Sequence, residues 1–258
     1  MKQYIVDAFS DKIFSGNPAA VCILDSFPSE DIMQSIATEN NLSETAFVVK
    51  MNDRYHIRWF TPKSEIDFCG HATLATAFVL FNYYAQYADI LNLYGQIGEF
   101  TVRRSGELIR MEFPAYKLEH IEIKDTMIEA LGIIPMAAYK DRDILFVLRD
   151  EDEVRDLQPD MELISKLDGA CVAVTAKGHD YDCVSRVFAP RYGMNEDPVT
   201  GSTHCMIAPY WSRRLNKTNI SAFQASSRTG ILYCECIGGK VIISGKAVLF
   251  SINDIVAL

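Results

Sequence analysis

The 258-residue sequence lacks the features typical of membrane, nucleic-acid-binding and secreted proteins. Its longest apolar runs, such as residues 75–81, are far shorter than the roughly 20 residues that span a bilayer. The net charge is −9 and no cluster of Lys and Arg is present, so we expect neither a nucleic-acid nor a membrane partner. Asp7 interrupts the first apolar segment too early for a secretion signal. We therefore expect a cytoplasmic protein.

The sequence also lacks the cysteine patterns that mark disulfide frameworks and metal sites. It contains seven cysteines, an odd number scattered through apolar segments, and no C-x-x-C pair. We find no nucleotide-binding motif either. The cysteine pattern predicts reduced thiols and no metal site.

One phrase occurs twice in the chain. The first copy is Arg58–Pro62 followed by Asp67 and Gly70–Thr73, and the second is Arg186–Pro190 followed by Asp197 and Gly201–His204. Each copy has the pattern of a strand, a polar loop and the first turn of an apolar helix. Helix starts of this kind hold anions through free backbone N–H groups and the helix dipole, although Gly, Ser and Thr are also favoured at ordinary helix starts. The duplication favours a pseudo-twofold protein with a carboxylate-binding cleft between its halves.

The apolar periodicity predicts helices surrounded by strands in both halves. Helices are expected near 30–39, 71–85, 124–131, 160–167 and 202–214. Strands are expected near 3–9, 19–24, 45–50, 55–60, 143–149, 170–175, 181–189, 219–224, 231–237 and 240–251, and three β-like runs within 88–113. Hairpin-like strand spacing favours an α+β fold over a doubly wound parallel sheet. We expect an N-terminal lobe, 1–116, and a C-terminal lobe, 117–258. The last strand or tail of the chain packs either within the second lobe or back on the first.

Several phrases spread along the chain resemble one known family. They are Phe14-x-Gly16-Asn17-Pro18-Ala19-Ala20-Val21, Leu42-Ser43-Glu44-Thr45-Ala46-Phe47, Phe60-Thr61-Pro62, Phe68-Cys69-Gly70-His71-Ala72-Thr73 and Glu196-Asp197-Pro198-Val199-Thr200-Gly201-Ser202-Thr203-His204-Cys205. In this order they resemble the PhzF-like family, named for the phenazine-biosynthesis isomerase and sharing the diaminopimelate epimerase fold. A weaker match, Gln224-x-x-x-Arg228-x-Gly230, has Ala225 where the family pattern has Gly. The resemblance implies two pseudo-symmetric β-barrel-like lobes, each around a central helix, with the active site between them. It also implies a homodimer and cofactor-free chemistry.

The resemblance assigns roles to residues of the first copy. Glu44 alone would be expected at the surface, but it matches the family's catalytic acid/base. His71, directly after Gly70, matches a pocket residue that polarises the substrate or helps to hold its carboxylate. Asn17 lies in a Gly-Asn-Pro turn and is either structural or part of the substrate site.

The resemblance also assigns roles to residues of the second copy. Asp197 precedes a proline, as turn residues often do, but it matches a substrate-binding residue. Ser202 and the backbone N–H groups that follow Gly201 match a site for a carboxylate or hydroxyl. The implied partner is a small carboxylic acid.

Cys69 raises a second mechanism. Diaminopimelate epimerase uses two cysteines, and Cys69 aligns with the first, whereas Thr200 aligns with the second. Because a threonine hydroxyl does not exchange a proton at neutral pH, a symmetric two-thiol racemase is disfavoured, and we expect Cys69 and Cys205 to be small buried apolar residues.

Three functions remain open from the sequence. The first is a cofactor-independent isomerase in which Glu44 moves a proton between carbons of a small carboxylic acid. The second is an amino-acid-type epimerase or racemase with Cys69 or Asp197 as a second acid/base. The third is a non-catalytic small-molecule binder.

Overall fold

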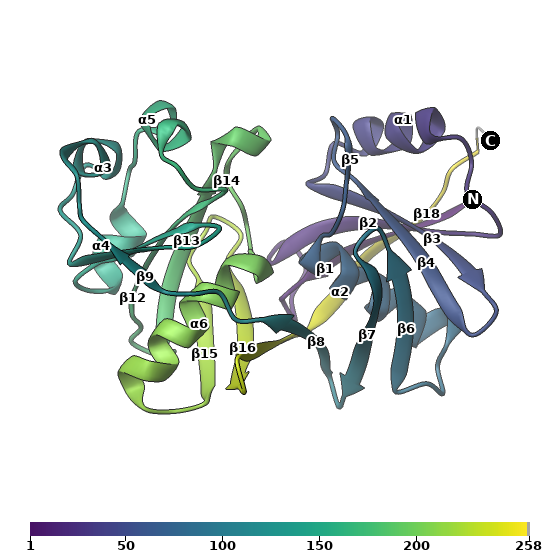
Figure 1. Cartoon of the computed structure of the whole chain (residues 1–258). Helices are drawn as coiled ribbons and strands as arrows, with labels where there is room; N and C mark the ends of the chain where they lie inside the picture. The colour runs from purple at the N-terminus through teal and green to yellow at the C-terminus, as the bar shows by residue number, and fades with distance from the viewer. Residues whose placement is uncertain (257–258) are drawn as a thin grey trace. The chain divides into compact units, whose positions relative to one another are not determined.

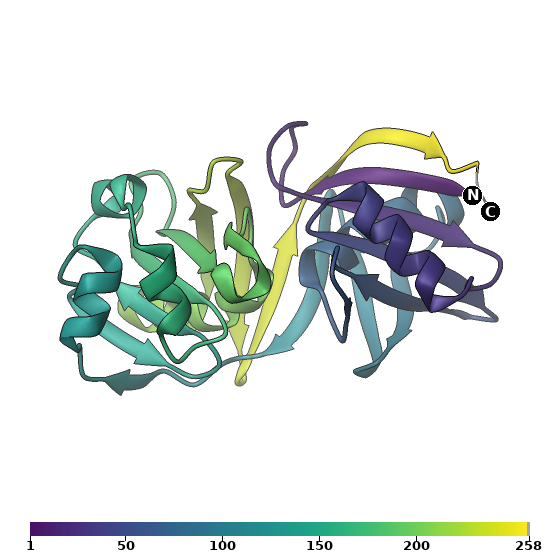
Figure 2. The ribbon, with the colours of Figure 1, turned by 90° about the horizontal axis from the view of Figure 1, so that it is seen from above.

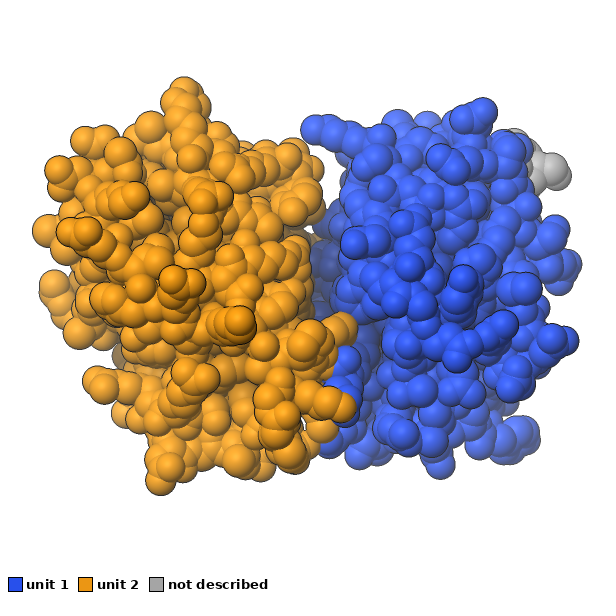
Figure 3. Space-filling view, viewed as in Figure 1, with its two compact units in different colours: residues 1–112, 244–258 blue, residues 113–243 orange. Residues whose placement is uncertain are grey.

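The structure is a computed structural model, described over residues 1–256, and it divides into two units (Figure 3). Unit 1 comprises Met1–Glu112 together with the segment that begins at Ser244, and unit 2 comprises Phe113–Ile243. The last strand of the chain therefore belongs to the same unit as the first. In the described residues, no helix has the length and apolar character needed to cross a membrane.

Unit 1 is a sheet with a helix packed inside it (Figure 1). Its elements are β1 (Lys2–Ala8), β2 (Asn17–Leu24), α1 (Glu30–Asn40), β3 (Glu44–Met51), β4 (Arg54–Phe60), β5 (Glu65–Ile66), α2 (Gly70–Val79), η1 (Leu80–Tyr84), β6 (Ile90–Gly95), β7 (Gly98–Ser105), β8 (Leu108–Pro114) and β18 (Ala247–Asp254). Hydrogen bonds give the strand order β18-β1-β2-β3-β4-β6-β7-β8. The pairs β2/β3 and β4/β6 are parallel, and the others are antiparallel.

Helix α2 is the central helix of unit 1. Apolar residues lie on nearly every side of it, and eight of its ten residues are buried, as expected for a helix enclosed by other elements. It packs on β1, β2, β3 and β18. The helix expected over 71–85 is present as two successive parts, because after Val79 the hydrogen-bond pattern changes and the chain continues as the π turn η1, closed by the Ala85 N–H to Leu80 O hydrogen bond.

Helix α1 packs on β3 and β4, and it stands at the front of unit 1 in Figure 2. A separate apolar cluster joins it to the sheet through Cys22, Met33, Ala37, Phe47 and Phe60. Because this cluster anchors β3 from the helix side, it fixes the strand that begins at Glu44.

Unit 2 repeats the arrangement. Its elements are β9 (Glu119–Ile121), α3 (Asp125–Leu131), β10 (Ala137–Lys140), β11 (Ile144–Val147), α4 (Glu151–Asp156), α5 (Met161–Lys166), β12 (Val172–Lys177), β13 (Cys183–Ala189), η2 (Pro190–Tyr192), β14 (Met194–Glu196), α6 (Gly201–Leu215), β15 (Asn219–Gln224), β16 (Gly230–Ile237) and β17 (Lys240–Gly245), which runs two residues past the unit boundary. Helix α6 packs on β15 and β16.

The two units share the same order of strands, helix and strand pairings along the chain. A parallel pair (β2/β3, β11/β12) leads to an antiparallel strand (β4, β13), then a short strand (β5, β14), the central helix (α2, α6), a strand parallel to the earlier one (β6, β15) and a hairpin partner (β7, β16). The predicted α+β fold of two pseudo-symmetric lobes, each around a central helix, is confirmed.

Candidate active site

The candidate site of unit 1 lies where two parallel strands and one helix begin. Asn17 is the first residue of β2, Glu44 is the first of β3, and His71 is the second residue of α2. The β2/β3 register pairs Ala19 with Glu44, so both strand starts lie at the same edge of the sheet. Asn17, Glu44 and His71 are all buried, which is unusual for a Glu and requires that its carboxylate be paired.

His71 connects the polar groups of this site. Its Nε2 lies 2.9 Å from Glu44 Oε2, and its Nδ1 lies 3.1 Å from Asn17 Nδ2 and 3.5 Å from Cys69 Sγ. The Nε2 side of the ring faces the carboxylate, and the Nδ1 side faces Asn17 and Cys69. The imidazole therefore holds the Glu44 carboxylate in one orientation.

The electrostatics of the cluster favour a charged pair. Burial by itself would lower the pKa of His71, but the neighbouring Cys69 and Glu44 outweigh this and raise that pKa well above its ordinary value. Burial raises the pKa of the Cys69 thiol to about 11, so Cys69 is a neutral thiol at neutral pH. Glu44 is thus the group that stabilises the protonated imidazole at neutral pH.

Glu44, Cys69 and His71 each place one potential ligand atom within 4.8 Å of the others. A cation would need a thiolate and an imidazole nitrogen without a proton. The raised pKa values of Cys69 and His71 oppose both requirements. The cluster therefore fits a hydrogen-bonded acid/base group better than a metal centre.

The corresponding position in unit 2 is the turn that leads into α6. Thr200 Oγ1 donates to Asp197 Oδ2 at 2.6 Å, and Gln224 at the end of β15 bonds both residues. Gly201 and Ser202 form the first turn of α6, with Gly201 buried and Ser202 half-buried. The sequence assigned no role to Thr200. The only sequence feature that pointed to Gln224 was the weak match to the family pattern that begins at this residue.

Another buried carboxylate, Asp143, supports α6 from inside unit 2. It accepts hydrogen bonds from Thr203 Oγ1 at 2.8 Å and from the Cys171 N–H at 3.1 Å. Burial raises its pKa above the usual range. His204, also in the first turns of α6, donates from Nδ1 to Thr200 O at 2.7 Å. Burial lowers the pKa of His204 to about 4, so this histidine is neutral at neutral pH.

The structure brings Asn17, Glu44, Gly70 and His71 together at the start of α2. A second group, Asp197, Gly201 and Ser202, gathers at the start of α6. The expectation that Cys69 and Cys205 are buried agrees with their environments. Cys69 nevertheless lies beside His71, so it is part of the polar cluster as well.

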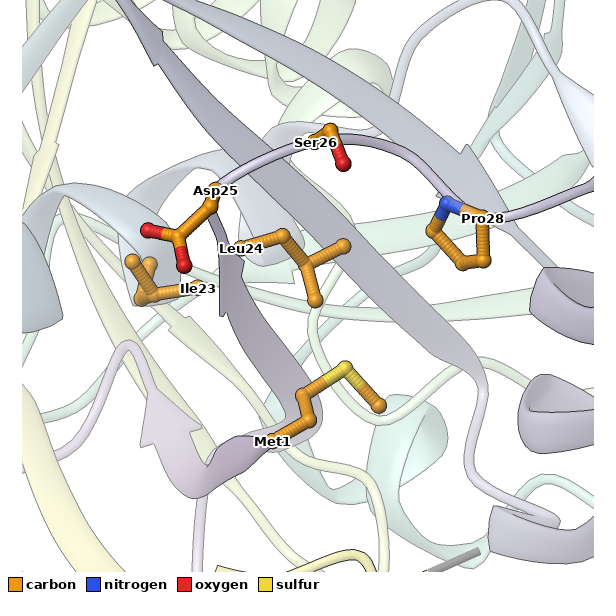
Figure 4. Close-up of a pocket in the computed structure, with 6 residues that line it drawn as sticks. All are labelled: Met1, Ile23, Leu24, Asp25, Ser26 and Pro28. Atoms are coloured by element: carbon orange, nitrogen blue, oxygen red, sulfur yellow. The ribbon is translucent and has the colours of Figure 1, made fainter. Parts of the chain in front are cut away.

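A separate pocket of about 330 Å³ lies at the far end of β2 (Figure 4). Its lining residues are Met1, Ile23, Leu24, Asp25, Ser26 and Pro28. Asn17 begins β2 and Leu24 ends it, so the pocket lies roughly 20 Å along the strand from the Glu44 cluster. None of the expected site residues lines it.

Comparison with known proteins gives consistent results. The family described as phenazine biosynthesis-like protein (PhzC-PhzF) matches residues 6–252. A Pseudomonas aeruginosa protein named as an uncharacterized isomerase is 49% identical over 245 residues, which is 95% of each chain. The crystal structure of a PhzF-family phenazine biosynthesis protein from Enterococcus faecalis superimposes with a TM-score of 0.97 at 49% identity, covering 99% of both chains.

A more distant structure, titled a predicted epimerase from Pseudomonas aeruginosa, matches with a TM-score of 0.75 at 18% identity, covering 100% of this chain and 99% of that one. At this identity the likeness concerns the fold alone. The closer relatives support the predicted enzyme class, an isomerase. The chain therefore belongs to the phenazine biosynthesis-like, or PhzF, family.

Proposed function

We propose that this isomerase is cofactor-independent and that Glu44 moves a proton between two carbons of a small carboxylic acid. The observation that carries the proposal is the buried Glu44 carboxylate, held 2.9 Å from His71 at the start of the central helix of unit 1. A single carboxylate in a fixed orientation suits removal of a proton from one carbon and its return to another.

The reaction has two proton transfers. Glu44 takes a proton from an activated carbon, and the electron pair of the broken C–H bond spreads into the conjugated substrate and its carboxyl group. The protonated His71 ring and the backbone N–H groups after Cys69 stabilise this negative charge. Glu44 then returns the proton to a second carbon as the double bond moves, so the carboxylate is regenerated.

The remaining expected site residues are proposed to bind the substrate. Asn17 holds the His71 ring through Nδ1, and Gly70 lets the substrate approach the helix start, because a Cβ there would meet no atom within 4 Å. Asp197, Gly201 and Ser202, at the start of α6, are proposed as further substrate-binding residues.

The test uses proton exchange with solvent. The enzyme is incubated in deuterated water with a panel of small unsaturated carboxylic acids, and product formation and deuterium uptake are followed by NMR and mass spectrometry. We expect turnover of at least one acid and its loss in Glu44→Gln, which is nearly isosteric and cannot cycle a proton. Turnover that survives Glu44→Gln would overturn the assignment.

One observation favours a second candidate, an epimerase. The Cys69 thiol lies 3.5 Å from His71 Nδ1, so it is available as a second acid/base beside the same ring, and Asp197 remains the other choice for that role. An epimerase inverts one stereocentre and incorporates solvent deuterium at that carbon. Loss of turnover in Cys69→Ala with retained binding would favour it, whereas retained turnover would leave the single-carboxylate mechanism.

Two further expectations stay predictions. A homodimer is expected from the family, and sedimentation velocity would measure it. A non-catalytic binder would show ligand-dependent increases in melting temperature across the same acids without any turnover.

A further inference from the structure

Gln224 holds the turn in front of α6 from a neighbouring strand. Its side chain is fully buried, and it ends β15, which lies parallel to β13. Its Oε1 accepts the Thr200 N–H at 2.9 Å, and its Nε2 donates to the Asp197 carbonyl at 2.7 Å and to Thr200 Oγ1 at 3.3 Å. One amide therefore bonds both ends of the segment from Asp197 to Thr200.

The backbone decides which way this amide points. The Thr200 N–H is only a donor and the Asp197 carbonyl is only an acceptor, so the amide oxygen must face the first and the amide nitrogen the second. Thr200 Oγ1 then receives an N–H from Gln224 and has its own proton left to donate. That proton is directed to Asp197 Oδ2, 2.6 Å away.

A directed hydroxyl matters because an aspartate carboxylate has a broad torsional preference about its terminal bond. Without a donor at Oδ2, the Asp197 carboxylate would be less restricted in its rotation at the start of α6. The network from Gln224 through Thr200 to Asp197 supplies this donor inside the protein.

We propose that Gln224 and Thr200 are positioning residues that orient the Asp197 carboxylate for substrate binding, an inference that rests on the proposed role of Asp197. Neither residue needs to touch the substrate. Thr200 occupies the position before the α6 glycine that Cys69 occupies before the α2 glycine. Sequence reasoning considered that position only for acid/base chemistry; its role in unit 2 is to pass on a hydrogen bond.

The test compares four variants of the full-length protein. Thr200→Val removes the hydroxyl at nearly constant shape, Thr200→Ser keeps it, and Gln224→Glu replaces the donating amide by a carboxyl group. Ser226→Ala is the matched control, because it removes a buried hydrogen bond to Pro198 O in the same segment without touching the Asp197 side chain.

We expect kcat/KM for the acid found in the solvent-exchange assay to fall on the order of 100-fold in Thr200→Val. Thr200→Ser restores most of it, and Ser226→Ala stays near the wild-type value. Gln224→Glu is inactive at neutral pH, and its activity relative to wild type at the same pH recovers as the pH is lowered, because a protonated carboxyl group again donates one hydrogen bond. Equal losses in Thr200→Val and Ser226→Ala, or no recovery of Gln224→Glu at low pH, would overturn the proposal.

A second readout is independent of turnover. In protein labelled with ¹³C at aspartate carboxyl carbons, the Asp197 signal is assigned by its disappearance in Asp197→Asn. We expect Thr200→Val to shift this signal and Thr200→Ser and Ser226→Ala to leave it in place. If Glu44→Gln keeps turnover while this pattern holds, the proposed function fails and the positioning role stands. If the signal does not move in Thr200→Val, the positioning role fails by itself.

Discussion

The starts of the two central helices share their approach and differ in what holds them. In unit 1, Arg58 on β4 pairs with Glu65 on β5 at 2.6 Å, and in unit 2, Arg186 on β13 pairs with Glu196 on β14 at 2.8 Å. Each guanidinium also lies over the phenylalanine two residues on, Phe60 or Phe188. The repeated sequence motif therefore corresponds to a repeated arrangement before each helix, an Arg–Glu ion pair with the Arg side chain over a Phe ring. We call this arrangement the platform.

Beyond this platform the two starts diverge. In unit 1, the loop before α2 is held by ring packing, since Trp59 contacts Phe68 and Phe100. A Cβ on Gly95, the last residue of β6, would lie 2.8 Å from the Trp59 ring. In unit 2, the last residue of β15 is Gln224, whose amide holds the loop by hydrogen bonds.

The histidines of the two helices differ in the same way. His71 of α2 faces a carboxylate, which raises its pKa, whereas His204 of α6 faces a backbone carbonyl and its pKa is lowered by burial. At neutral pH His71 is thus charged and His204 neutral, which is consistent with placing the proton-transfer chemistry in unit 1.

The largest expected effect separates two of the buried carboxylates, Glu44 in unit 1 and Asp143 in unit 2. Glu44→Gln should reduce kcat by about 10³-fold, because the acid/base is removed. Asp143→Asn should reduce it by less than about tenfold, since Asp143 is bound by Thr203, the Cys171 N–H and Arg142 and has no proposed part in the proton transfer. Steady-state rates with the acid identified by solvent exchange measure both, and a greater loss in Asp143→Asn would reverse the comparison.

The second prediction concerns packing. Trp59→Ala should lower the free energy of unfolding by about 3–5 kcal/mol, because it empties a fully buried site among aromatic rings. The counterpart in the repeat, Val187→Ala, is also fully buried and should cost about 1–2 kcal/mol, since only two methyl-sized groups are removed. Urea denaturation compares the two, and equal costs would contradict the idea that unit 1 relies more on ring packing.

The third prediction uses the opposite pKa shifts of the two histidines. The pKa of His71 is raised, so its contribution to stability is complete below about pH 6.5 and is lost as the pH rises through the raised value. The pKa of His204 is lowered to about 4, so protonation opposes folding as the pH falls from 6.5 to about 4. That shift corresponds to about 3 kcal/mol at the acid end.

Urea denaturation between pH 4 and pH 9 measures these slopes. Relative to wild type, His204→Gln should flatten the pH dependence on the acid side, and His71→Asn should flatten it above about pH 6.5. The two histidines would be equivalent, contrary to the structure, if both variants changed the same side of the profile.

The smallest expected effect tests the shared platform. Arg58→Lys should lower the free energy of unfolding by about 1 kcal/mol, because it loses the bidentate contact with Glu65. Arg186→Lys should lower the free energy of unfolding by about 2 kcal/mol, since Arg186 also donates to the Leu157 carbonyl at 2.7 Å. Thermal unfolding of both variants checks the order, which would be wrong if Arg58→Lys proved the more damaging.

Much of the fold could be predicted from local patterns. The repeat located both central helices, and the apolar circumference of α2 predicted its enclosure. Short elements were missed for a physical reason: α4, six residues capped by Asp150, is too short to show a helical period. The strand expected over 240–251 is two strands, β17 and β18, that begin in different units, and such partners cannot be read from one stretch of chain.

The sequence by itself determined the family, the α+β class, the repeat and the residue types available for chemistry, because these depend on local pattern and on motif order. Only the tertiary structure decided which groups touch. His71 meets Glu44 across 27 positions and Gln224 meets Thr200 across 24, and contacts of that separation follow from strand register and helix placement. For the same reason, the histidines of the two central helices acquired opposite pKa shifts: burial acts on both, but only His71 was brought against a carboxylate.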